Sequence, residues 1–278
     1  MKILIYGAGQ TGEQIYRNIM NKHDVIGFLD GNDQKWGTLV AGVKVLGGPS
    51  KLQELEYDQV YIGSSFWQEV RETLINHGVP EERIVIDIPE DLSSPVRTTW
   101  LECYSKLHSD WNYAVAEGGV YRGDFASVIN RCFPNSKLYL FDTFEGFDER
   151  DIAIEINKEY SNPQQEFFSN TSIELVLSKM DNKDMVEVYK GHFPQTANGI
   201  EDYFCFVNLD FDLYQPILEG LRFFYPKMIP GSVILIHDYY HIGLPGVKDA
   251  ISDYENELKI KLIKFPIGDN QSIAIVKI

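Results

Sequence analysis

The chain has 278 residues, 44% of them hydrophobic and 24% charged, a globular composition with enough material for two domains. There are 25 Lys and Arg against 41 Asp and Glu, and this net charge of −16 argues against nucleic acid and anionic membranes as partners, since both need clustered cations. We expect no signal peptide, no membrane span, and neither a disulfide framework nor a structural zinc site, because Cys103, Cys132 and Cys205 lack CxxC spacing. A cytoplasmic location with reduced thiols follows from these expectations.

Strand-like and helix-like segments alternate along the chain, which predicts an α/β fold with parallel sheets. Residues 87–99 interrupt this alternation with two prolines and paired serines, which indicate a linker. We therefore predict two Rossmann-like domains with a boundary near residue 92, residues 1–92 and 93–278. The strands are expected within residues 2–7, 24–30, 59–64, 83–87, 112–117, 137–142, 185–191, 205–210, 232–238, 260–267 and 271–278.

The last two of these segments are separated only by Gly268, Asp269 and Asn270. Three residues are too few for a parallel crossover, so the two strands must form an antiparallel hairpin. A parallel sheet that ends in such a hairpin is expected of a class I methyltransferase sheet and is unusual for a plain dinucleotide-binding domain.

A first glycine-rich loop follows the strand at residues 2–7 and places Gly7, Gly9 and Gly12 at the start of a helix. Glycines in this context let the backbone approach a pyrophosphate, and the helix N-terminus offers free N–H groups. Asp30 ends the second strand, where an acid commonly binds ribose hydroxyls. We predict that these four residues bind a nucleotide or NAD; the alternative is an inherited turn without a ligand.

This half of the chain also resembles a known domain. The segments IYGAGQTGEQIYRNI (residues 5–19), IGFLDGNDQKWGTLVAGVKVLG (26–47) and DQVYIGSS (58–65) are similar to the small N-terminal Rossmann-type domain of nucleotide-sugar-modifying enzymes of polysaccharide synthesis. The resemblance implies a nucleotide-sugar as the ligand of the first loop. No catalytic Tyr/Lys pair is evident before the linker, which argues against a complete dehydrogenase.

A second glycine-rich loop follows the strand at residues 112–117, where Glu117 precedes Gly119, Gly123 and a helical segment. The glycines are expected to clear space for a ligand, and the acid suits the cationic and hydroxyl groups of S-adenosylmethionine. Asp142 ends the next strand, where a carboxylate accepts hydrogen bonds from ribose, and His192 follows the third strand, near the expected adenine. Solvated acids at strand ends are the alternative reading, but acids at successive strand ends beside glycines favour a nucleoside site.

Acidic residues also follow the next two strands. Asp210 and Asp212 lie on the same side of one strand end, and His237 and Asp238 end the neighbouring strand. Three carboxylates with no Lys or Arg among them would repel one another unless a cation lay between them, so we predict a divalent cation. Oxygen ligands suit Mg²⁺, whereas the imidazole favours Mn²⁺, Fe²⁺ or Zn²⁺. The alternative is a helix-capping Asp212 and a core His237.

Five motifs in this half resemble the macrocin O-methyltransferase family, which methylates sugar hydroxyls with S-adenosylmethionine and a divalent metal. The motifs are GVYRGDFA (119–126), LYLFDTFEGF (138–147), YKGHFPQT (189–196), LDFDLYQPILEGLRFFYPKMIPGSVILIHDY (209–239) and GVKDAI (246–251). The resemblance implies cofactor binding by Glu117, Gly119, Tyr121, Gly123, Asp142, Thr143, His192 and Asp210. It also implies a metal bound by Asp210, His237 and Asp238, with Asp212 as the general base. The family usually has aspartate at the position of His237. Two alternatives therefore stay open: the site binds a metal other than magnesium, or it has lost its metal.

Together the two halves predict an S-adenosylmethionine-dependent O-methyltransferase that acts on a sugar or nucleotide-sugar in polysaccharide biosynthesis. Residues 150–170 are polar and aromatic and are expected to form a mobile lid, with a surface helix as the alternative. Two rival functions stay open: an NAD-dependent sugar-nucleotide oxidoreductase, and a non-catalytic sugar-nucleotide-binding scaffold. A homo-oligomer held together by the first domain is a further open alternative.

Overall fold

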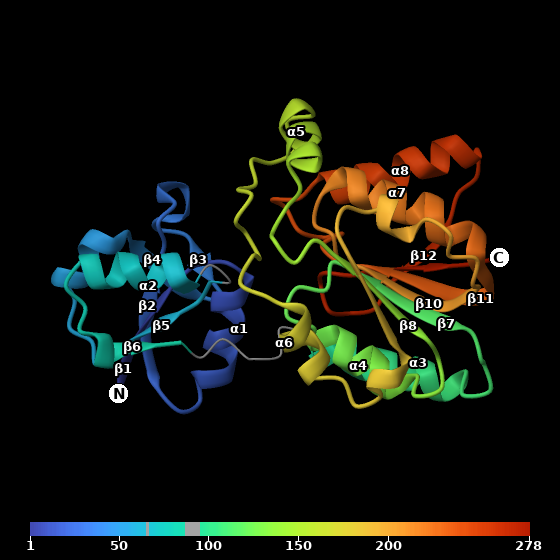
Figure 1. Ribbon diagram of the computed structural model, residues 1–278. Helices are drawn as coiled ribbons and strands as arrows, with labels where there is room; N and C mark the ends of the chain where they lie inside the picture. The colour runs from blue at the N-terminus through green and yellow to red at the C-terminus, as the bar shows by residue number, and fades with distance from the viewer. Residues whose placement is uncertain (65–66, 87–94) are drawn as a thin grey trace. The chain divides into compact units, whose positions relative to one another are not determined.

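The computed structural model describes residues 1–64, 67–86 and 95–278. The chain divides into two compact units, Met1–Glu90 and Asp91–Ile278, and each unit has its own sheet (Figure 1). The predicted domain boundary near residue 92 lies outside the described residues. Within the three described ranges, no helix combines the length and the apolar character that a membrane crossing needs.

The first unit is built on a six-stranded sheet with the strand order β3-β4-β2-β1-β5-β6. Its elements are β1 (Lys2–Tyr6), α1 (Gln10–Ile19), β2 (Asp24–Leu29), β3 (Leu39–Val40), β4 (Val43–Gly47), β5 (Gln59–Ile62), α2 (Trp67–Asn76) and β6 (Ile84–Val85). Successive residues of β1 point to opposite faces, so Ile3 and Ile5 pack with α1 while Leu4 packs with Leu74 of α2. All neighbouring strands are parallel except β3 and β4.

The sequence pattern missed the β3–β4 hairpin. Ala41 and Gly42 connect its strands, and both have positive φ, 49° and 84°, as a type I′ turn requires. Because the turn carries Ala-Gly in place of Asn-Gly and β3 has only two residues, the usual hairpin signal is weak.

The second unit is built on a seven-stranded sheet with the strand order β12-β13-β11-β10-β7-β8-β9. Its strands are β7 (Ala114–Gly118), β8 (Leu138–Asp142), β9 (Val186–Lys190), β10 (Phe204–Leu209), β11 (Met228–Ile236), β12 (Ile263–Pro266) and β13 (Ile273–Val276). The strands β7 to β11 are parallel to one another, and β13 is antiparallel to both β11 and β12. The predicted α/β class and the predicted C-terminal hairpin are confirmed.

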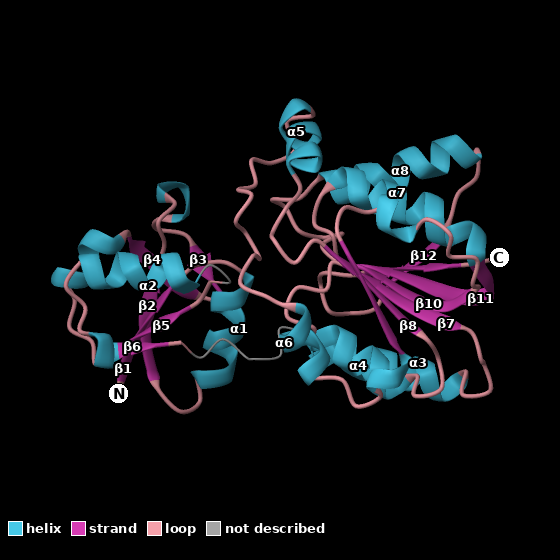
Figure 2. Ribbon diagram, in the orientation of Figure 1, coloured by secondary structure: helices cyan, strands magenta, loops and turns pink. Residues whose placement is uncertain are grey.

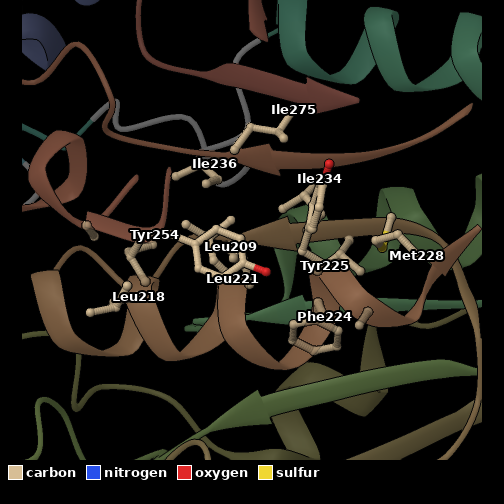
Figure 3. Close-up of a cluster of buried hydrophobic side chains, with 14 of the residues drawn as sticks. Leu209, Leu218, Leu221, Phe224, Tyr225, Met228, Ile234, Ile236, Tyr254 and Ile275 are labelled. Atoms are coloured by element: carbon tan, nitrogen blue, oxygen red, sulfur yellow. The ribbon is translucent and has the colours of Figure 1, made fainter. Parts of the chain in front are cut away.

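Helices cover both faces of this second sheet (Figure 2). The helices of this unit are α3 (Pro95–Leu107), α4 (Asp124–Cys132), α5 (Glu149–Asn157), α6 (Ile173–Ser178), α7 (Tyr214–Phe224) and α8 (Gly246–Leu258). One face packs against α7 and α8 and the other against α3 and α4. On α7, Leu218, Leu221 and Phe224 recur at helical spacing and pack on Leu209 of β10 and Ile234 of β11 (Figure 3).

The predicted linker is partly wrong, because α3 begins inside it at Pro95. Proline is tolerated in the first turn of a helix, where its missing N–H has no intrahelical partner to lose. As a result, Arg97, which the sequence pattern placed in a linker, lies on a helix of the second unit and is buried.

The central strands of the second sheet end at the same level. Gly118 of β7 pairs with Leu209 of β10, which pairs with Ile236 of β11, and Gly118 also pairs with Phe141 of β8. The residues that follow these strands are therefore neighbours at one sheet edge, the usual ligand-binding edge of an α/β fold.

Candidate functional site

The first glycine-rich loop is tightly packed at two of its three glycines. A Cβ atom at Gly7 would lie 2.3 Å from the carbonyl oxygen of Gly63, and one at Gly12 would lie 1.9 Å from that of Gly7. At Gly9, by contrast, no described atom lies within 4 Å of such a Cβ. Gly7 and Gly12 are thus required by the turn and by helix–strand packing, whereas Gly9 borders open space where a ligand could approach the backbone.

Asp30, predicted to bind ribose, uses its carboxylate within the protein. Its Oδ2 accepts hydrogen bonds from the Ala8 N–H at 2.7 Å and from Lys35 Nζ at 3.0 Å, and its Oδ1 accepts one from the Asn32 N–H at 2.9 Å. Burial alone would raise the pKa of Asp30, but these donors outweigh burial and lower it. Asp30 therefore fastens the glycine loop to the end of β2, and ribose binding by it stays a prediction.

In the second unit, the glycines make room for protein, contrary to the expectation that they clear space for a ligand. A Cβ at Gly119 would lie 2.0 Å from the Asp210 carbonyl oxygen, and one at Gly123 would lie 2.9 Å from Val176. Both glycines have positive φ, near 80°, and both N–H groups donate to carbonyls of the protein. Their predicted role in cofactor binding is therefore indirect: they shape the loop between β7 and α4.

Glu117 at the end of β7 is a buried carboxyl group with one free oxygen. It is 2% exposed; its Oε1 accepts a hydrogen bond from Asn208 Nδ2 at 2.9 Å, while its Oε2 has no partner among the described residues. Burial raises the pKa of Glu117 well above its ordinary value, and the nearby Asp210 carboxylate raises it further. A cationic ligand group beside Oε2 would supply the missing partner, so this residue fits the amino group of S-adenosylmethionine.

Asp142 at the end of β8 holds the loop after β7 in place. Its Oδ2 accepts hydrogen bonds from the N–H groups of Val120 and Tyr121 at 2.7 and 2.8 Å, and its Oδ1 accepts one from Phe144 at 2.7 Å. Burial raises the pKa of Asp142 although these three donors oppose the shift. A carboxylate has about four lone-pair positions, so one remains for a hydroxyl group of a ligand.

The other predicted cofactor residues lie on loops around this carboxylate. The Tyr121 hydroxyl donates to Asn170 Oδ1 at 2.7 Å. Thr143 lines a cavity of about 310 Å³ formed by the loop after β8 and the start of α5. His192 lies with its Nε2 3.1 Å from a carboxylate oxygen of Asp151 on α5.

The segment predicted as a lid is helical in its first part. Glu155 of α5 is fully buried, and its Oε2 accepts a hydrogen bond from the Tyr214 N–H at the start of α7 at 3.1 Å. The hydrogen bond holds α5 against the start of α7, which agrees with the surface-helix alternative. Closure of residues 150–170 over a substrate stays a prediction.

The acidic residues after β10 and β11 form one cluster, which we call the acid cluster: Asp210, Asp212, His237 and Asp238. The Nδ1 atom of His237 lies 3.0 Å from Asp210 Oδ1 and 2.9 Å from Asp238 Oδ2. Burial alone would lower the pKa of His237, but the two carboxylates outweigh it and raise that pKa to about 10. The His237 cation in turn lowers the pKa of Asp238 despite the burial of that carboxylate.

Asp212 differs from the other two aspartates of the acid cluster. Burial and the neighbouring Asp238 carboxylate raise the pKa of Asp212 well above its ordinary value, and the two side chains share a hydrogen bond. Its backbone has a positive φ of 63°, a conformation that Asp and Asn tolerate better than most residues. The expected helix cap is not its role, because Leu213 precedes the first residue of α7.

The expectation of a cluster without basic residues is wrong, because Arg97 contacts it. Arg97 Nη1 lies 2.8 Å from Asp210 Oδ2, and the guanidinium carbon lies 4.1 Å from the centre of the Phe125 ring. Sequence analysis missed this residue because it placed residue 97 in the linker. The hydrogen-bonding residues Asn208 and Lys35 were missed as well.

Ligand atoms of Asp210, His237 and Asp238 lie within 4.8 Å of one another, a spacing that a metal ion can use. Arg97 changes the charge balance around them, however. The prediction of a cation rested on the lack of a basic residue among the carboxylates, and Arg97 already binds Asp210. Repulsion among carboxylates that lack a basic neighbour was the argument for a metal ion, and Arg97 removes that argument.

Sequence profiles of two families match the chain. The C2185-like N-terminal profile matches residues 1–85, and the macrocin-O-methyltransferase (TylF) profile matches residues 105–271, more than half of the chain.

A curated relative and two solved structures are similar to the chain. The relative is 8-demethyl-8-(2,3-dimethoxy-α-L-rhamnosyl)-tetracenomycin-C 4′-O-methyltransferase of Streptomyces olivaceus, 24% identical over 52% of this chain and 59% of that protein. The O-methyltransferase NovP aligns at 20% identity and a TM-score of 0.52, covering 66% of this chain and 79% of NovP. The calicheamicin methyltransferase CalS11 aligns at 17% identity and a TM-score of 0.52, covering 81% of this chain and 96% of CalS11. At these identities the two structures establish a shared fold.

Proposed function

Because the chain belongs to the macrocin-O-methyltransferase (TylF) family, we propose that it transfers a methyl group from S-adenosylmethionine to a sugar hydroxyl. The name of the curated relative, a 4′-O-methyltransferase of a rhamnosyl-tetracenomycin, supports a sugar as the acceptor. One structural observation carries the proposal: a buried carboxyl with an unpartnered oxygen, Glu117, lies at the same sheet edge as the acid cluster.

The cofactor site of the proposal combines groups at the ends of β7 and β8. S-adenosylmethionine supplies, when bound, a methyl group on a sulfonium centre that a hydroxyl oxygen can attack. Glu117 Oε2 binds the amino group, and Asp142 offers its remaining lone pair to a ribose hydroxyl. Tyr121, Thr143 and His192 complete the site as predicted cofactor residues.

Asp212 is the proposed general base. Its pKa is raised by burial and by Asp238, and a carboxylate with a raised pKa is a stronger base than an ordinary aspartate. The chain holds Asp212 beside the Asp238 carboxylate, whose charge acts on Asp212 directly. When Asp212 takes the proton of the acceptor hydroxyl, the oxygen gains the negative charge that an attack on carbon needs.

The first unit is proposed to bind the nucleotide part of a nucleotide-sugar or another nucleotide such as NAD. Gly9 supports this proposal, because no atom of the described residues lies close enough to its Cα to require a glycine there. The N–H groups at the start of α1 would face a phosphate at this position. Binding of UDP-, GDP- and CDP-sugars and NAD to the full chain, measured by calorimetry, tests this part; the Gly9→Ala variant serves as the matched control.

An acceptor screen tests the transfer reaction. The purified full chain is incubated with S-adenosylmethionine and a panel of nucleotide-sugars and glycosides, and S-adenosylhomocysteine is quantified by mass spectrometry. We expect formation that depends on the acceptor and falls in the Asp212→Asn variant. If NAD is reduced by the same panel while no S-adenosylhomocysteine forms, the oxidoreductase alternative replaces the proposal.

A further inference from the structure

We infer that Arg97 is the resident cation of the acid cluster and positions Asp210 without a divalent metal ion. This inference rests in part on the proposed function, because it concerns the site at which methyl transfer is proposed. It assigns a role to a residue that neither the motifs nor the family resemblance singled out.

Arg97 is held in place from two sides. Its side chain is 5% exposed, its Nη1 lies 2.8 Å from Asp210 Oδ2, and its guanidinium carbon lies 4.1 Å from the Phe125 ring centre. An arginine does not lose its charge in a protein, so the positive charge beside Asp210 is permanent. The aromatic ring on the other side favours a cation at this position.

The second oxygen of Asp210 is used as well. Asp210 Oδ1 lies 3.0 Å from His237 Nδ1, and the same nitrogen lies 2.9 Å from Asp238 Oδ2. The His237 ring thus occupies the space between the two carboxylates. Both oxygens of Asp210 and one of Asp238 therefore already have partners within the chain.

A divalent cation at this place would have to displace these donors. It would compete with Arg97 and His237 for the two carboxylate oxygens of Asp210. Mg²⁺ in particular requires oxygen ligands in near-octahedral geometry, and the three residues offer two carboxylates and one imidazole. The arrangement favours an internal cation that keeps Asp210 fixed next to Glu117 and Asp212.

Manganese binding tests the inference without any acceptor sugar. The full chain is freed of metal with EDTA and titrated with Mn²⁺, which is followed by calorimetry and by electron paramagnetic resonance. We expect a Kd weaker than about 1 mM for the wild type and at least about tenfold tighter binding for the double variant Arg97→Met, His237→Asp, which removes both internal donors and adds a carboxylate. The variant Arg131→Met, which removes an exposed arginine paired with Glu102, should leave binding unchanged.

A Kd tighter than about 1 mM for the wild type would overturn the inference. This test uses the wild-type protein alone, so it does not depend on whether a variant folds. A folded double variant that gains no affinity for Mn²⁺ would overturn the claim that Arg97 and His237 exclude the metal. Once an acceptor is known, Arg97→Met should lower kcat more than it raises KM for that acceptor, and Arg97→Lys should recover part of the loss. Failure of every acceptor would count against the proposed function and leave the manganese result valid.

Discussion

Replacement of Asp212 by asparagine should remove the proposed base and leave the fold intact. The amide has nearly the same size, its NH2 group can donate to the Asp238 carboxylate, and asparagine tolerates the positive φ of 63°. Burial and the Asp238 carboxylate raise the pKa of Asp212, so a neutral amide at this position avoids the cost of burying a charge. The variant should therefore melt within about 2 °C of the wild type, or higher.

Activity should respond very differently. A positioned base is worth roughly 10²–10⁴-fold in rate, which corresponds to about 2.7–5.4 kcal/mol at 1.36 kcal/mol per factor of ten. We expect Asp212→Asn to lower kcat by this factor while the affinity for S-adenosylhomocysteine changes little. Because the pKa of Asp212 is raised, wild-type kcat should fall on the acid side at a pH above the ordinary aspartate value of about 3.9.

The assay is initial-rate formation of S-adenosylhomocysteine with saturating acceptor, together with thermal melting of each variant. Asp184→Asn, at an exposed position in the same unit, is the matched control and should leave kcat unchanged. Retention of wild-type kcat by Asp212→Asn would refute the assignment of Asp212 as the base. A large loss of melting temperature would refute the reasoning that the amide preserves the local contacts.

Three further predictions concern stability and ligand binding. Gly12→Ala should destabilise the first unit by about 1–3 kcal/mol in denaturant titration, because its Cβ would lie 1.9 Å from a carbonyl oxygen. The control Gly9→Ala should unfold with a free energy within about 0.5 kcal/mol of the wild type. Equal effects of the two substitutions would contradict the packing argument. Asp30→Asn should lower the free energy of unfolding by about 1–3 kcal/mol at pH 7. Because the folded-state pKa of Asp30 is lowered, the stability difference between the two proteins should be fully present above about pH 4 and should disappear as the pH falls through that lowered pKa. A stability difference that does not change with pH would exclude this linkage. Glu117→Gln should weaken S-adenosylmethionine binding about 10–100-fold in calorimetry, because the amide cannot offer a charged oxygen to the cationic amino group. Unchanged affinity in this variant would argue against Glu117 as the amino-group receptor.

The parts of the fold that the sequence could predict are those with a strong local signal. Buried parallel strands such as β10 are nearly continuous apolar runs, and a connection of three residues allows only a hairpin between β12 and β13. The β3–β4 hairpin and the start of α3 were missed because their signals are weak: a two-residue strand, an Ala-Gly turn, and a proline that occurs in linkers and in first helical turns alike.

For the site, the sequence could predict which strand ends carry the functional groups, but it could not predict what each group contacts. Glu117, Asp210 and His237 do meet at one sheet edge, because neighbouring parallel strands end there. Most partners of Asp30 and Asp142 are backbone N–H groups, which all residues except proline have, so no pattern of side chains reveals them. Arg97 reaches Asp210 from 113 positions away in the sequence, and only tertiary packing brings the two together.

The central claim is that the methyl group of S-adenosylmethionine is transferred to a sugar oxygen. The most direct test supplies S-adenosylmethionine with a deuterated methyl group and an acceptor from the screen, and then measures S-adenosylhomocysteine and O-methylated sugar in the same reaction by mass spectrometry and NMR. The account predicts equal amounts of both products, with the label in a methyl ether of the sugar. S-adenosylhomocysteine without labelled sugar, or label on a nitrogen or carbon atom, would contradict it.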